Sequence, residues 1–279
     1  MMYKMLVSDL DETLLNDDGT INQKNVDAIK KATAMGFKFV PNTGRSFKSV
    51  AALLTKLGLK DVANQYVISY NGGAIVENED DRLVITRGVD FELAKTIFHA
   101  GLINDTVDAH VYTVDTLYIY NISPSDKQYM EERQVPYQII DEANIDFLQD
   151  ANIMKVIFES TDEQVRQDIR TAVLAEVEGQ VEATFSSGRY IEFNKKGTDK
   201  GSASLMLGEK LGIAQTEIIA AGDNNNDLSM IKAVGLGVAV QNAIPTVKEA
   251  ADVVTERTNN EGAVAEIFEK YVFPDWVEA

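Results

Sequence analysis

The chain has 279 residues, of which 45% are hydrophobic and 25% are charged, so it can bury a full core and is long enough for two domains. Its 44 acidic and 26 basic residues give a formal charge of -18, a field that repels nucleic acids and anionic membranes, and neither is expected as a partner. The absence of cysteine excludes disulfides, thiolate catalysis and cysteine-ligated metals. The sequence also lacks any apolar stretch of about 18 residues, so the cytoplasm is the expected location.

The first part of the chain alternates between short apolar runs and amphipathic segments. The turn Asp18-Gly19 indicates a small hairpin or flap, and Asn22 can cap the helix that follows it. The expected strands are residues 4–8, 37–41 and 66–70, and the expected helices are 26–35 and 46–58. A turn at 71–73 closes this region.

The same alternation resumes near residue 200. The expected helices are 200–212, 225–235, 244–251 and 262–272, and the expected strands are 217–223, 236–240 and 251–255. Strands that alternate with helices are typical of a parallel sheet covered on both faces. The predicted fold class is therefore α/β, with a Rossmann-like parallel sheet core and helices on both faces.

The middle of the chain mixes segment types. Residues 114–122 and 152–160 have strand patterns, and residues 162–179 have a helical pattern. We predict an inserted α+β cap domain over residues 83–195, and a core formed by residues 1–82 and 196–279. Both histidines, His99 and His110, lie in this insert outside any motif, and structural roles are expected for them.

Four aspartates stand out because each pair follows an apolar run. Asp9 and Asp11 follow the first expected strand, and Asp223 and Asp227 follow the strand near residue 219. The carboxyl ends of parallel strands meet at one edge of a sheet, so these carboxylates need a counter-charge there. A hard divalent cation such as Mg²⁺ that shares a substrate phosphate supplies one. The pattern predicts a phosphoryl-transfer site.

Asp9 and Asp11 lie two residues apart, a spacing that projects both side chains to one side of an extended strand. One carboxylate could attack phosphorus, and the other could protonate the leaving oxygen and later deprotonate water. A polar strand end alone would explain the pair equally well. The second aspartate cluster favours the functional interpretation.

Two further segments are suited to bind an anion. Thr43-Gly44-Arg45 follows an expected strand and precedes a helix, where free N–H groups and a hydroxyl can bind phosphate. Lys200-Gly201 opens another helix, and this lysine can neutralise charge developing in the transfer. Each segment alone also fits an ordinary turn or helix start, but their order along the chain is specific.

The set DLDET, NTGR, Lys200-Gly201 and GDNNND resembles the four motifs of the haloacid dehalogenase-like phosphatases. The wide gap between the second and third motifs resembles the Cof-type subfamily, whose members have a large α+β cap and act like sugar phosphatases. By resemblance, Asp9 is the nucleophile and a Mg²⁺ ligand, and Asp11 is the general acid/base and binds the metal through its backbone carbonyl. Asp223 is the remaining protein ligand. Asp227 is either a ligand or a group that orients the lysine or metal-bound water.

The resemblance also implies a set of groups that hold the transferred phosphoryl group: the backbone N–H of Leu10, Thr43, Gly44, Lys200 and Asn226. Glu12 departs from the pattern, because many relatives have glycine there, but its backbone carbonyl rather than its side chain is expected to face the site. The implied function is hydrolysis of small phosphorylated metabolites, sugar phosphates foremost, through an aspartyl-phosphate.

Substrate contacts are expected from Arg45, from Asn71 in SYNGG and from Arg189 in the cap. A flavin or pyridoxal phosphate substrate stays open, and nothing in the sequence indicates an oligomeric state. Two other functions also stay open: a phosphomutase with the same aspartates, and a non-catalytic sensor of a phosphorylated metabolite. A sensor would be expected to lack a catalytic aspartate or the lysine, and all of them are present.

Overall fold

The computed structural model describes residues 3–274, which fall into two compact units. The first unit contains the chain up to Thr86 and again from Asp199, and the second contains Arg87–Thr198. The insert was expected to begin at residue 83, but β5 (Arg82–Thr86) pairs with β4 (Ala74–Glu77) and so stays with the first unit. Trp276, for which the sequence suggests only a packing or partly exposed position, lies outside the described residues.

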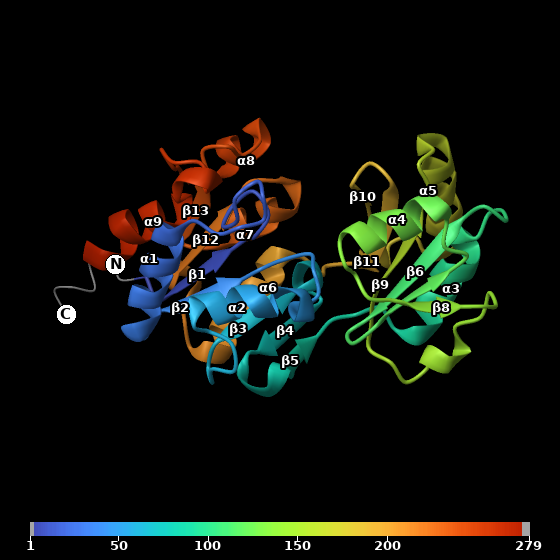
Figure 1. The fold of residues 1–279 in the computed structure, drawn as a ribbon, viewed down its shortest axis with the longest axis horizontal. Coiled ribbons are helices and arrows are strands. Elements are labelled where there is room, and N and C mark those ends of the chain that lie inside the picture. The colour runs from blue at the N-terminus through green and yellow to red at the C-terminus, as the bar shows by residue number, and fades with distance from the viewer. Residues whose placement is uncertain (1–2, 275–279) are drawn as a thin grey trace. The chain divides into compact units, whose positions relative to one another are not determined.

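A five-stranded parallel sheet is the centre of the first unit, with the strand order β14-β13-β12-β1-β2 (Figure 1). Its strands are β1 (Met5–Ser8), β2 (Lys38–Pro41), β12 (Ile218–Gly222), β13 (Leu236–Ala239) and β14 (Val253–Val254). Every residue of β1 and β12 is buried, as expected of strands covered on both faces. Ser8 pairs with Ala221, so the residues that follow β1 and β12 lie at one sheet edge.

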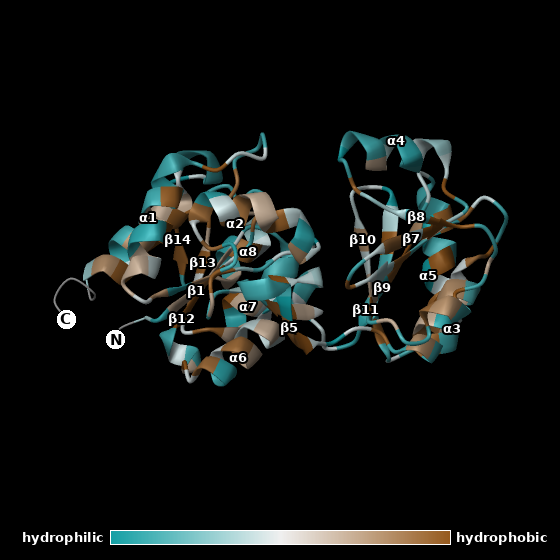
Figure 2. Cartoon of the chain, turned by 60° about the horizontal axis from the view of Figure 1, so that its bottom comes forward, coloured by the Kyte–Doolittle hydropathy of each residue, from teal (hydrophilic) through white to brown (hydrophobic). Residues whose placement is uncertain are grey.

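Helices cover both faces of this sheet, which confirms the predicted α/β class. Met5 and Val7 pack toward Leu207 and Met230 on one face, and Phe39 lies against Phe268 on the other. The helices of this unit are α1 (Gln23–Ala34), α2 (Ala51–Leu57), α6 (Lys200–Leu211), α7 (Leu228–Ala233), α8 (Pro245–Ala250) and α9 (Ala263–Ile267). Hydrophobic residues follow the strands and polar residues the outer helix surfaces (Figure 2).

The expected third parallel strand has a different place. β3 (Tyr66–Ser69) pairs antiparallel with β4, and β4 pairs antiparallel with β5. One parallel bridge, between Asn42 and Ile68, joins β3 to the end of β2. Asn71 at φ 53° and Gly72 at φ 97° reverse the chain directly after β3, and such a tight turn can only join antiparallel strands.

Several α-helices are shorter than expected, because one end of the expected segment forms a 3₁₀ or π-helical turn instead. The 3₁₀ turns in this unit are η1 (Phe47–Val50), η2 (Tyr70–Gly72), η3 (Glu79–Asp81), η5 (Gln215–Glu217), η6 (Asn225–Asp227) and η7 (Asn259–Glu261). The final helix continues past α9 as a π-helical turn, η8 (Phe268–Val272). The turn at Asn225–Asp227 is important for the site, because it bends Asp227 back toward the end of β12.

The second unit is a six-stranded sheet with helices on both faces, an α+β arrangement. Its strands, in the spatial order β10-β11-β9-β6-β7-β8, are β10 (Val181–Ser186), β11 (Tyr190–Lys195), β9 (Ile153–Glu159), β6 (Asp108–Thr113), β7 (Leu117–Tyr120) and β8 (Gln138–Ile140). All neighbours are antiparallel except β7 and β8. Its helices are α3 (Phe91–Gly101), α4 (Pro124–Glu132), α5 (Glu163–Val177) and the 3₁₀ turn η4 (Asp146–Leu148).

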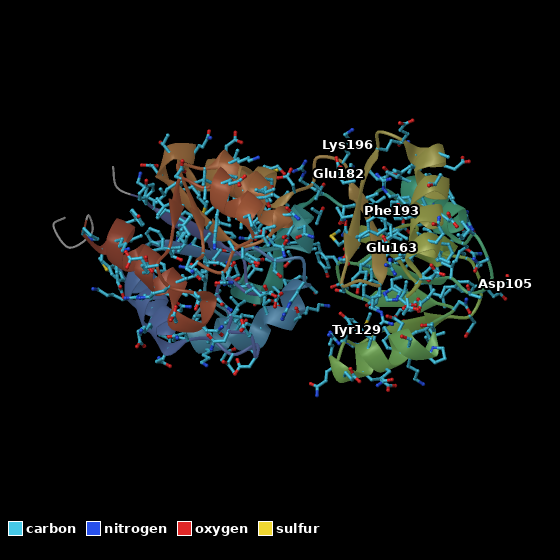
Figure 3. The ribbon with its side chains drawn as sticks, turned by 90° about the horizontal axis from the view of Figure 1, so that it is seen from above. Asp105, Tyr129, Glu163, Glu182, Phe193 and Lys196 are labelled. Carbon is cyan, nitrogen blue, oxygen red and sulfur yellow. The ribbon has the colours of Figure 1, made fainter. Side chains whose placement is uncertain are left out.

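The two faces of this sheet pack against different helices. Phe193 belongs to the cluster under α3 and α5, whereas Tyr129 of α4 packs with the cluster on the opposite face (Figure 3). Across residues 3–274, none of the helices combines the length and the apolar character needed to cross a membrane.

Candidate functional site

Two neighbouring strand ends bring the predicted aspartates together in the first unit. Asp9 follows β1, and its N–H donates to the carbonyl of Ala221 in β12 at 2.9 Å. Asp223 follows β12 itself, and both carboxylates are buried, with exposures of 7% and 4%. One carboxylate oxygen from each of Asp9, Asp223 and Asp227 lies within 4.8 Å of the others. The structure thus forms an acidic cluster at the edge that the sequence indicated.

Lys200 lies at the centre of this cluster. It is the first residue of α6, its side chain is fully buried, and its Nζ donates to Asp9 Oδ1 and to Asp227 Oδ1, the latter at 2.7 Å. The cap of α6 is Asp199, whose carboxylate accepts the N–H of Ser202. Lys200 therefore connects the ends of three segments that are far apart in the sequence.

Asp227 is held by the backbone. Its Oδ2 accepts the N–H groups of Asp223 at 2.9 Å and Asn224 at 3.0 Å. These bonds leave Oδ1 for Lys200 and fix its direction. Of the two predicted roles for Asp227, this geometry favours orienting the lysine.

The ionisation of these groups reflects their burial and mutual repulsion. Burial raises the pKa of Asp9 to about 8. The positive charge of Lys200 lowers this pKa, and the negative charges of Asp227 and Asp223 raise it further. Burial also raises the pKa of Asp223 to about 6, although a hydrogen bond from Thr13 lowers it. Burial lowers the pKa of Lys200, but Asp9 and Asp227 raise it above its ordinary value. When all three carboxylates are ionised, one ammonium leaves a deficit of two positive charges.

The acidic cluster fits a divalent cation. A deficit of two charges is what such an ion offsets, and carboxylate oxygens are the ligands that hard cations prefer. Asp9 and Asp223 could hold such an ion here, whereas Asp227 Oδ1 is already bound to Lys200.

The predicted anion-binding residues lie beside the cluster. Thr43 is 1% exposed, and its carbonyl accepts the N–H of Asn71 at 3.0 Å. A Cβ added to Gly44 would lie 3.2 Å from Asn71 Nδ2, so the loop and the turn are in close contact. Asn226 donates from its side chain to Asn71 Oδ1 at 3.3 Å. These contacts bring Thr43, Gly44, Asn71 and Asn226 to one rim.

Asp11 differs from the expectation of a shared strand face. β1 ends at Ser8, and Asp11 lies in the turn beyond it, with a side chain that is 55% exposed. Arg45 donates from Nε to Asp11 Oδ2 at 3.0 Å, and its own side chain is 47% exposed. Leu10, between the two aspartates, is fully buried and anchors the turn. Glu12 has φ 59°, a left-handed conformation that favours glycine.

Arg189 belongs to the second unit, where other groups already bind it. Its Nη2 donates to Glu159 Oε1 at 2.8 Å and to Ser125 Oγ at 2.6 Å, and the guanidinium lies 4.5 Å from the centre of the Tyr129 ring. The side chain is 12% exposed. These bonds hold the guanidinium within the second unit, and a substrate contact of Arg189 stays a prediction.

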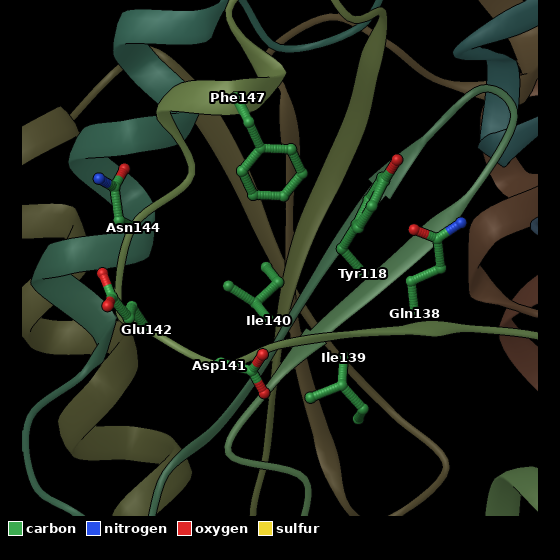
Figure 4. A pocket seen from close by; sticks show the side chains of 8 residues that line it. All are labelled: Tyr118, Gln138, Ile139, Ile140, Asp141, Glu142, Asn144 and Phe147. Atoms are coloured by element: carbon green, nitrogen blue, oxygen red, sulfur yellow. The ribbon is translucent and has the colours of Figure 1, made fainter.

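A cavity of about 380 Å³ also lies in the second unit (Figure 4). Its lining combines the apolar side chains of Tyr118, Ile139, Ile140 and Phe147 with the carboxylates of Asp141 and Glu142. None of the predicted site residues lines it. Acidic side chains repel a phosphate, so this cavity is a poor place for a phosphorylated substrate.

Two supporting residues were missed by the sequence analysis. Thr13 donates from Oγ1 to Asp223 Oδ1 at 2.6 Å, and the fully buried Asn42 donates to the carbonyl of Lys200 at 3.1 Å. Thr13 ends the motif DLDET and Asn42 begins the motif NTGR, so their place in these motifs was the signal that could have identified them. A buried polar side chain needs a hydrogen-bond partner, so a polar residue inside a buried motif is expected to support its neighbours in this way.

Comparisons with known proteins agree with this geometry. The family model of haloacid dehalogenase-like hydrolases matches residues 6–268. YxeH of Bacillus subtilis (strain 168), which has a provisional phosphatase name, is 33% identical over 275 residues, or 97% of this chain and 99% of that protein. YcsE of the same organism, named 5-amino-6-(5-phospho-D-ribitylamino)uracil phosphatase, is 32% identical and is matched over 96% of each chain.

The fold is also found in solved structures. A haloacid dehalogenase-like hydrolase from Bacteroides thetaiotaomicron has 28% sequence identity and a TM-score of 0.82. The similarity covers 96% of this chain and 99% of that one. The resemblance therefore extends through both units and is not confined to the acidic cluster.

Proposed function

The chain belongs to the haloacid dehalogenase-like hydrolases and is a phosphoric monoester hydrolase, and we propose that it depends on Mg²⁺, acts on small phosphorylated sugars and forms an aspartyl-phosphate on Asp9. The observation that carries this proposal is the buried contact of Asp9 with Lys200, beside Asp223. A carboxylate that attacks a phosphate needs positive charge around it. Lys200 supplies one charge, and the carboxylates of Asp9 and Asp223 could bind a cation that supplies more.

In the proposed site, the carboxylates of Asp9 and Asp223 and the backbone carbonyl of Asp11 would hold Mg²⁺. The ion supplies positive charge that offsets the charge of the phosphate and of the cluster. Lys200 adds a fixed positive charge beside Asp9, and Asp227 fixes the direction of Lys200. Thr43, Gly44, Asn226 and the N–H of Leu10 bind the phosphoryl oxygens.

The proposed reaction has two displacement steps at phosphorus. In the first, an oxygen of Asp9 forms a bond to phosphorus while the bond to the substrate oxygen breaks, and the carboxyl group of Asp11 gives its proton to that leaving oxygen. In the second, Asp11 takes a proton from water as the water oxygen attacks phosphorus. The bond between Asp9 and phosphorus then breaks, and phosphate and the free carboxylate result.

Asp11 is suited to this exchange because it lies at the solvent-exposed rim. Its pair with Arg45 is exposed at both ends, and exposed ion pairs break at a cost of about 1 kcal/mol or less. Arg45 can therefore release Asp11 and turn to a substrate anion. Asn71, beside Gly44, is a second candidate for substrate contact.

For the substrate, the similarity to YcsE adds a specific candidate, because that protein is named for a phosphate on a ribityl chain. Phosphorylated sugars and phosphorylated ribityl compounds share a phosphate ester on a polyhydroxylated carbon chain. We propose this shared chemistry as the substrate class. The mutase and sensor alternatives have no structural observation in their favour.

The test is phosphate release from sugar phosphates, a ribitylamino-uracil phosphate and p-nitrophenyl phosphate, each with Mg²⁺ and with EDTA. Wild type should release phosphate only with Mg²⁺, and Asp9→Asn should lose the activity although the change is nearly isosteric. Asp105→Asn, the same chemical change at an exposed position of the second unit, is the matched control.

Trapping the intermediate separates the proposal from its rivals. Acid-quenched wild type should carry a phosphoryl group that hydroxylamine removes, and Asp9→Asn should carry none. Activity that persists in pure Asp9→Asn protein would refute the nucleophile. An isomerised sugar phosphate without free phosphate would indicate a mutase.

A further inference from the structure

A second buried cluster of metal-binding side chain types lies in the second unit, outside the proposed active site. Asp108, His110 and Asp126 are each 0% exposed, and one ligand atom from each lies within 4.8 Å of the others. His110 Nε2 is 2.9 Å from Asp126 Oδ2 and 3.1 Å from Asp108 Oδ1. Three ligand atoms therefore converge in a place that water does not reach.

The fold brings these side chains together from two elements. Asp108 and His110 are two residues apart on β6, so their side chains lie on the same face of the sheet. Asp126 lies in the first turn of α4, which packs on that face, and Ser123 caps the helix by accepting the Asp126 N–H at 3.0 Å.

The outer oxygen of each carboxylate already has a donor. The Ser123 N–H donates to Asp108 Oδ2 at 2.9 Å, and the Tyr190 hydroxyl donates to Asp126 Oδ1 at 2.5 Å. Metal ligands are typically oriented by such outer hydrogen bonds. Here they leave Asp108 Oδ1 and Asp126 Oδ2 as the inner oxygens that face His110 Nε2.

One inner oxygen has no hydrogen-bond donor. Within residues 3–274, Asp108 Oδ1 has no hydrogen-bond partner, although it is buried and directed at His110. A single Nε2 proton can point at only one of the two carboxylates, and the geometry directs it to Asp126. A buried carboxylate oxygen without a partner costs free energy, and a cation between the three groups would satisfy it.

His110 Nδ1 also has no partner among the described residues. A protonated imidazolium would leave a charged N–H unpaired in a buried place, which costs more than an unpaired neutral N–H. A neutral ring with a metal at Nε2 avoids that charge. The Nδ1 N–H is unpaired with either a metal or a proton at Nε2, so this atom does not decide between them.

The local charges show the same need. The carboxylates of Asp108, Asp126 and Glu159 are buried together, and Arg189 is the cation beside them, 2.8 Å from Glu159 and 3.9 Å from Asp126. With a neutral imidazole this group has a deficit of two positive charges.

We propose that Asp108, His110 and Asp126 form a binding site for a divalent transition metal, with Zn²⁺ as the best-fitting ion. Histidine nitrogen and aspartate oxygen are both ligands that Zn²⁺ takes in proteins, and ligand atoms around tetrahedral Zn²⁺ lie about 3.3 Å apart. The observed spacings of 2.9 and 3.1 Å need only a small expansion. The ion would join β6 to α4 and stabilise the second unit.

This site differs in chemistry from the acidic cluster around Asp9. That cluster offers only oxygen and suits Mg²⁺, whereas an imidazole nitrogen selects transition metals. Saturating Mg²⁺ therefore occupies the first site while leaving the second for Co²⁺ or Zn²⁺. The proposal does not depend on the proposed catalytic function and is tested by binding.

The experiment uses the full chain, unfolded in EDTA and refolded with excess Mg²⁺, with and without Co²⁺. Refolding is needed because the site is buried. We expect one equivalent of tightly bound Co²⁺ whose visible bands differ from those of the hydrated ion, and Zn²⁺ should displace it. Asp126→Asn and His110→Gln should lose this equivalent, and His99→Gln, a change of the exposed histidine on α3, should keep it.

A second readout needs no variant of the site. The chain has two histidines, so a ¹⁵N-histidine-labelled His99→Gln protein shows the His110 ring alone. Zn²⁺ should shift its Nε2 resonance to that of a metal-bound nitrogen. A doubly protonated ring that ignores Zn²⁺, or refolded protein that binds no Co²⁺ beyond the Mg²⁺-protected site, would overturn the proposal and leave a buried ion pair.

Discussion

Lys200 Nζ and Asp227 Oδ1 lie 2.7 Å apart, and both side chains are fully buried. The same ammonium donates to Asp9, so the proposed nucleophile and the aspartate that orients the lysine share one cation. A buried charge is stable only while its partners stay in place. Stability and catalysis are therefore coupled at this lysine.

Replacing Asp227 by alanine should strongly destabilise the protein. The change removes one partner of Lys200 and the acceptor of two backbone N–H groups, those of Asp223 and Asn224. We expect the free energy of unfolding to fall by about 3–5 kcal/mol. Urea denaturation measures it, and the exposed Asp105→Ala should stay within about 0.5 kcal/mol of wild type. Equal effects of the two variants would show that the buried pair is not stabilising.

Arg45→Met should have little effect on stability, although it also breaks an ion pair. Both Arg45 and Asp11 are about half exposed, so water replaces the lost contact. The expected change in unfolding free energy is about 1 kcal/mol or less, measured in the same urea experiment. A loss as large as that of Asp227→Ala would mean that the pair organises the turn after β1.

The sequence could locate this site because the chemistry follows strand ends. The apolar runs before Asp9 and Asp223 predict buried parallel strands, and such strands place their carboxyl ends at one edge. Lys200 was recognised by its motif in spite of the long insert before it. Its partners were less certain, because the contact with Asp227 depends on a 3₁₀ turn that no periodicity reveals.

Other features could not be derived from local sequence. β3 has an apolar run like that of β1, yet the turn at Asn71 and Gly72 makes it antiparallel to β4. The strand spacing of Asp9 and Asp11 predicted a common face, but β1 ends before both of them, and Asp11 turns outward to Arg45. The cluster of His110 with Asp126 needs two elements to pack, so neither motif nor spacing could show it.

The stability of the metal-free protein should depend on pH through Asp9 and Asp223. Their folded pKa values, about 8 and about 6, lie above the ordinary 3.8, so the folded state binds more protons between about pH 4 and pH 8. The contribution of these groups is fully present below about pH 4 and is lost as the pH rises toward 8. Mg²⁺ requires the ionised carboxylates and should restore stability increasingly over the same range.

Thermal unfolding with Mg²⁺ and with EDTA, from pH 5.5 to 8.5, measures this effect. The gain in Tm on adding Mg²⁺ should grow with pH in wild type. In Asp9→Asn, which cannot titrate at this position, the pH dependence of the gain should be weaker. A gain that is constant with pH in wild type would contradict the assignment of these carboxylates as metal ligands.

Gly222→Ala should damage the site without removing a reacting group. A Cβ at this position would lie 2.6 Å from Asp227 Oδ2 and would displace the aspartate that holds Lys200. We expect a loss of about 1–3 kcal/mol in stability from overpacking and a fall in kcat of about 100-fold from misplacement of the lysine.

The control for this variant is Gly19→Ala. Gly19 has φ +76° and nothing within 4 Å of an added Cβ, so alanine there costs only about 1 kcal/mol of backbone strain. Its activity should match wild type. If Gly222→Ala keeps full kcat while losing stability, the position of Asp227 does not control the reaction.

Thr13→Val should weaken metal binding. The hydroxyl of Thr13 donates to Asp223 Oδ1 at 2.6 Å, and this bond both orients the carboxylate and lowers its pKa against the effect of burial. Valine has nearly the same shape but no donor, so Asp223 should lose its orientation. Its pKa should also rise, so that protons compete better with the metal for this carboxylate. The expected effect is an increase of about 10-fold in the Kd for Mg²⁺, measured by titration calorimetry at pH 7. Thr13→Ser keeps the hydroxyl and should bind Mg²⁺ almost as wild type does. If serine and valine weaken binding equally, the methyl group of Thr13 and not its hydrogen bond supports Asp223.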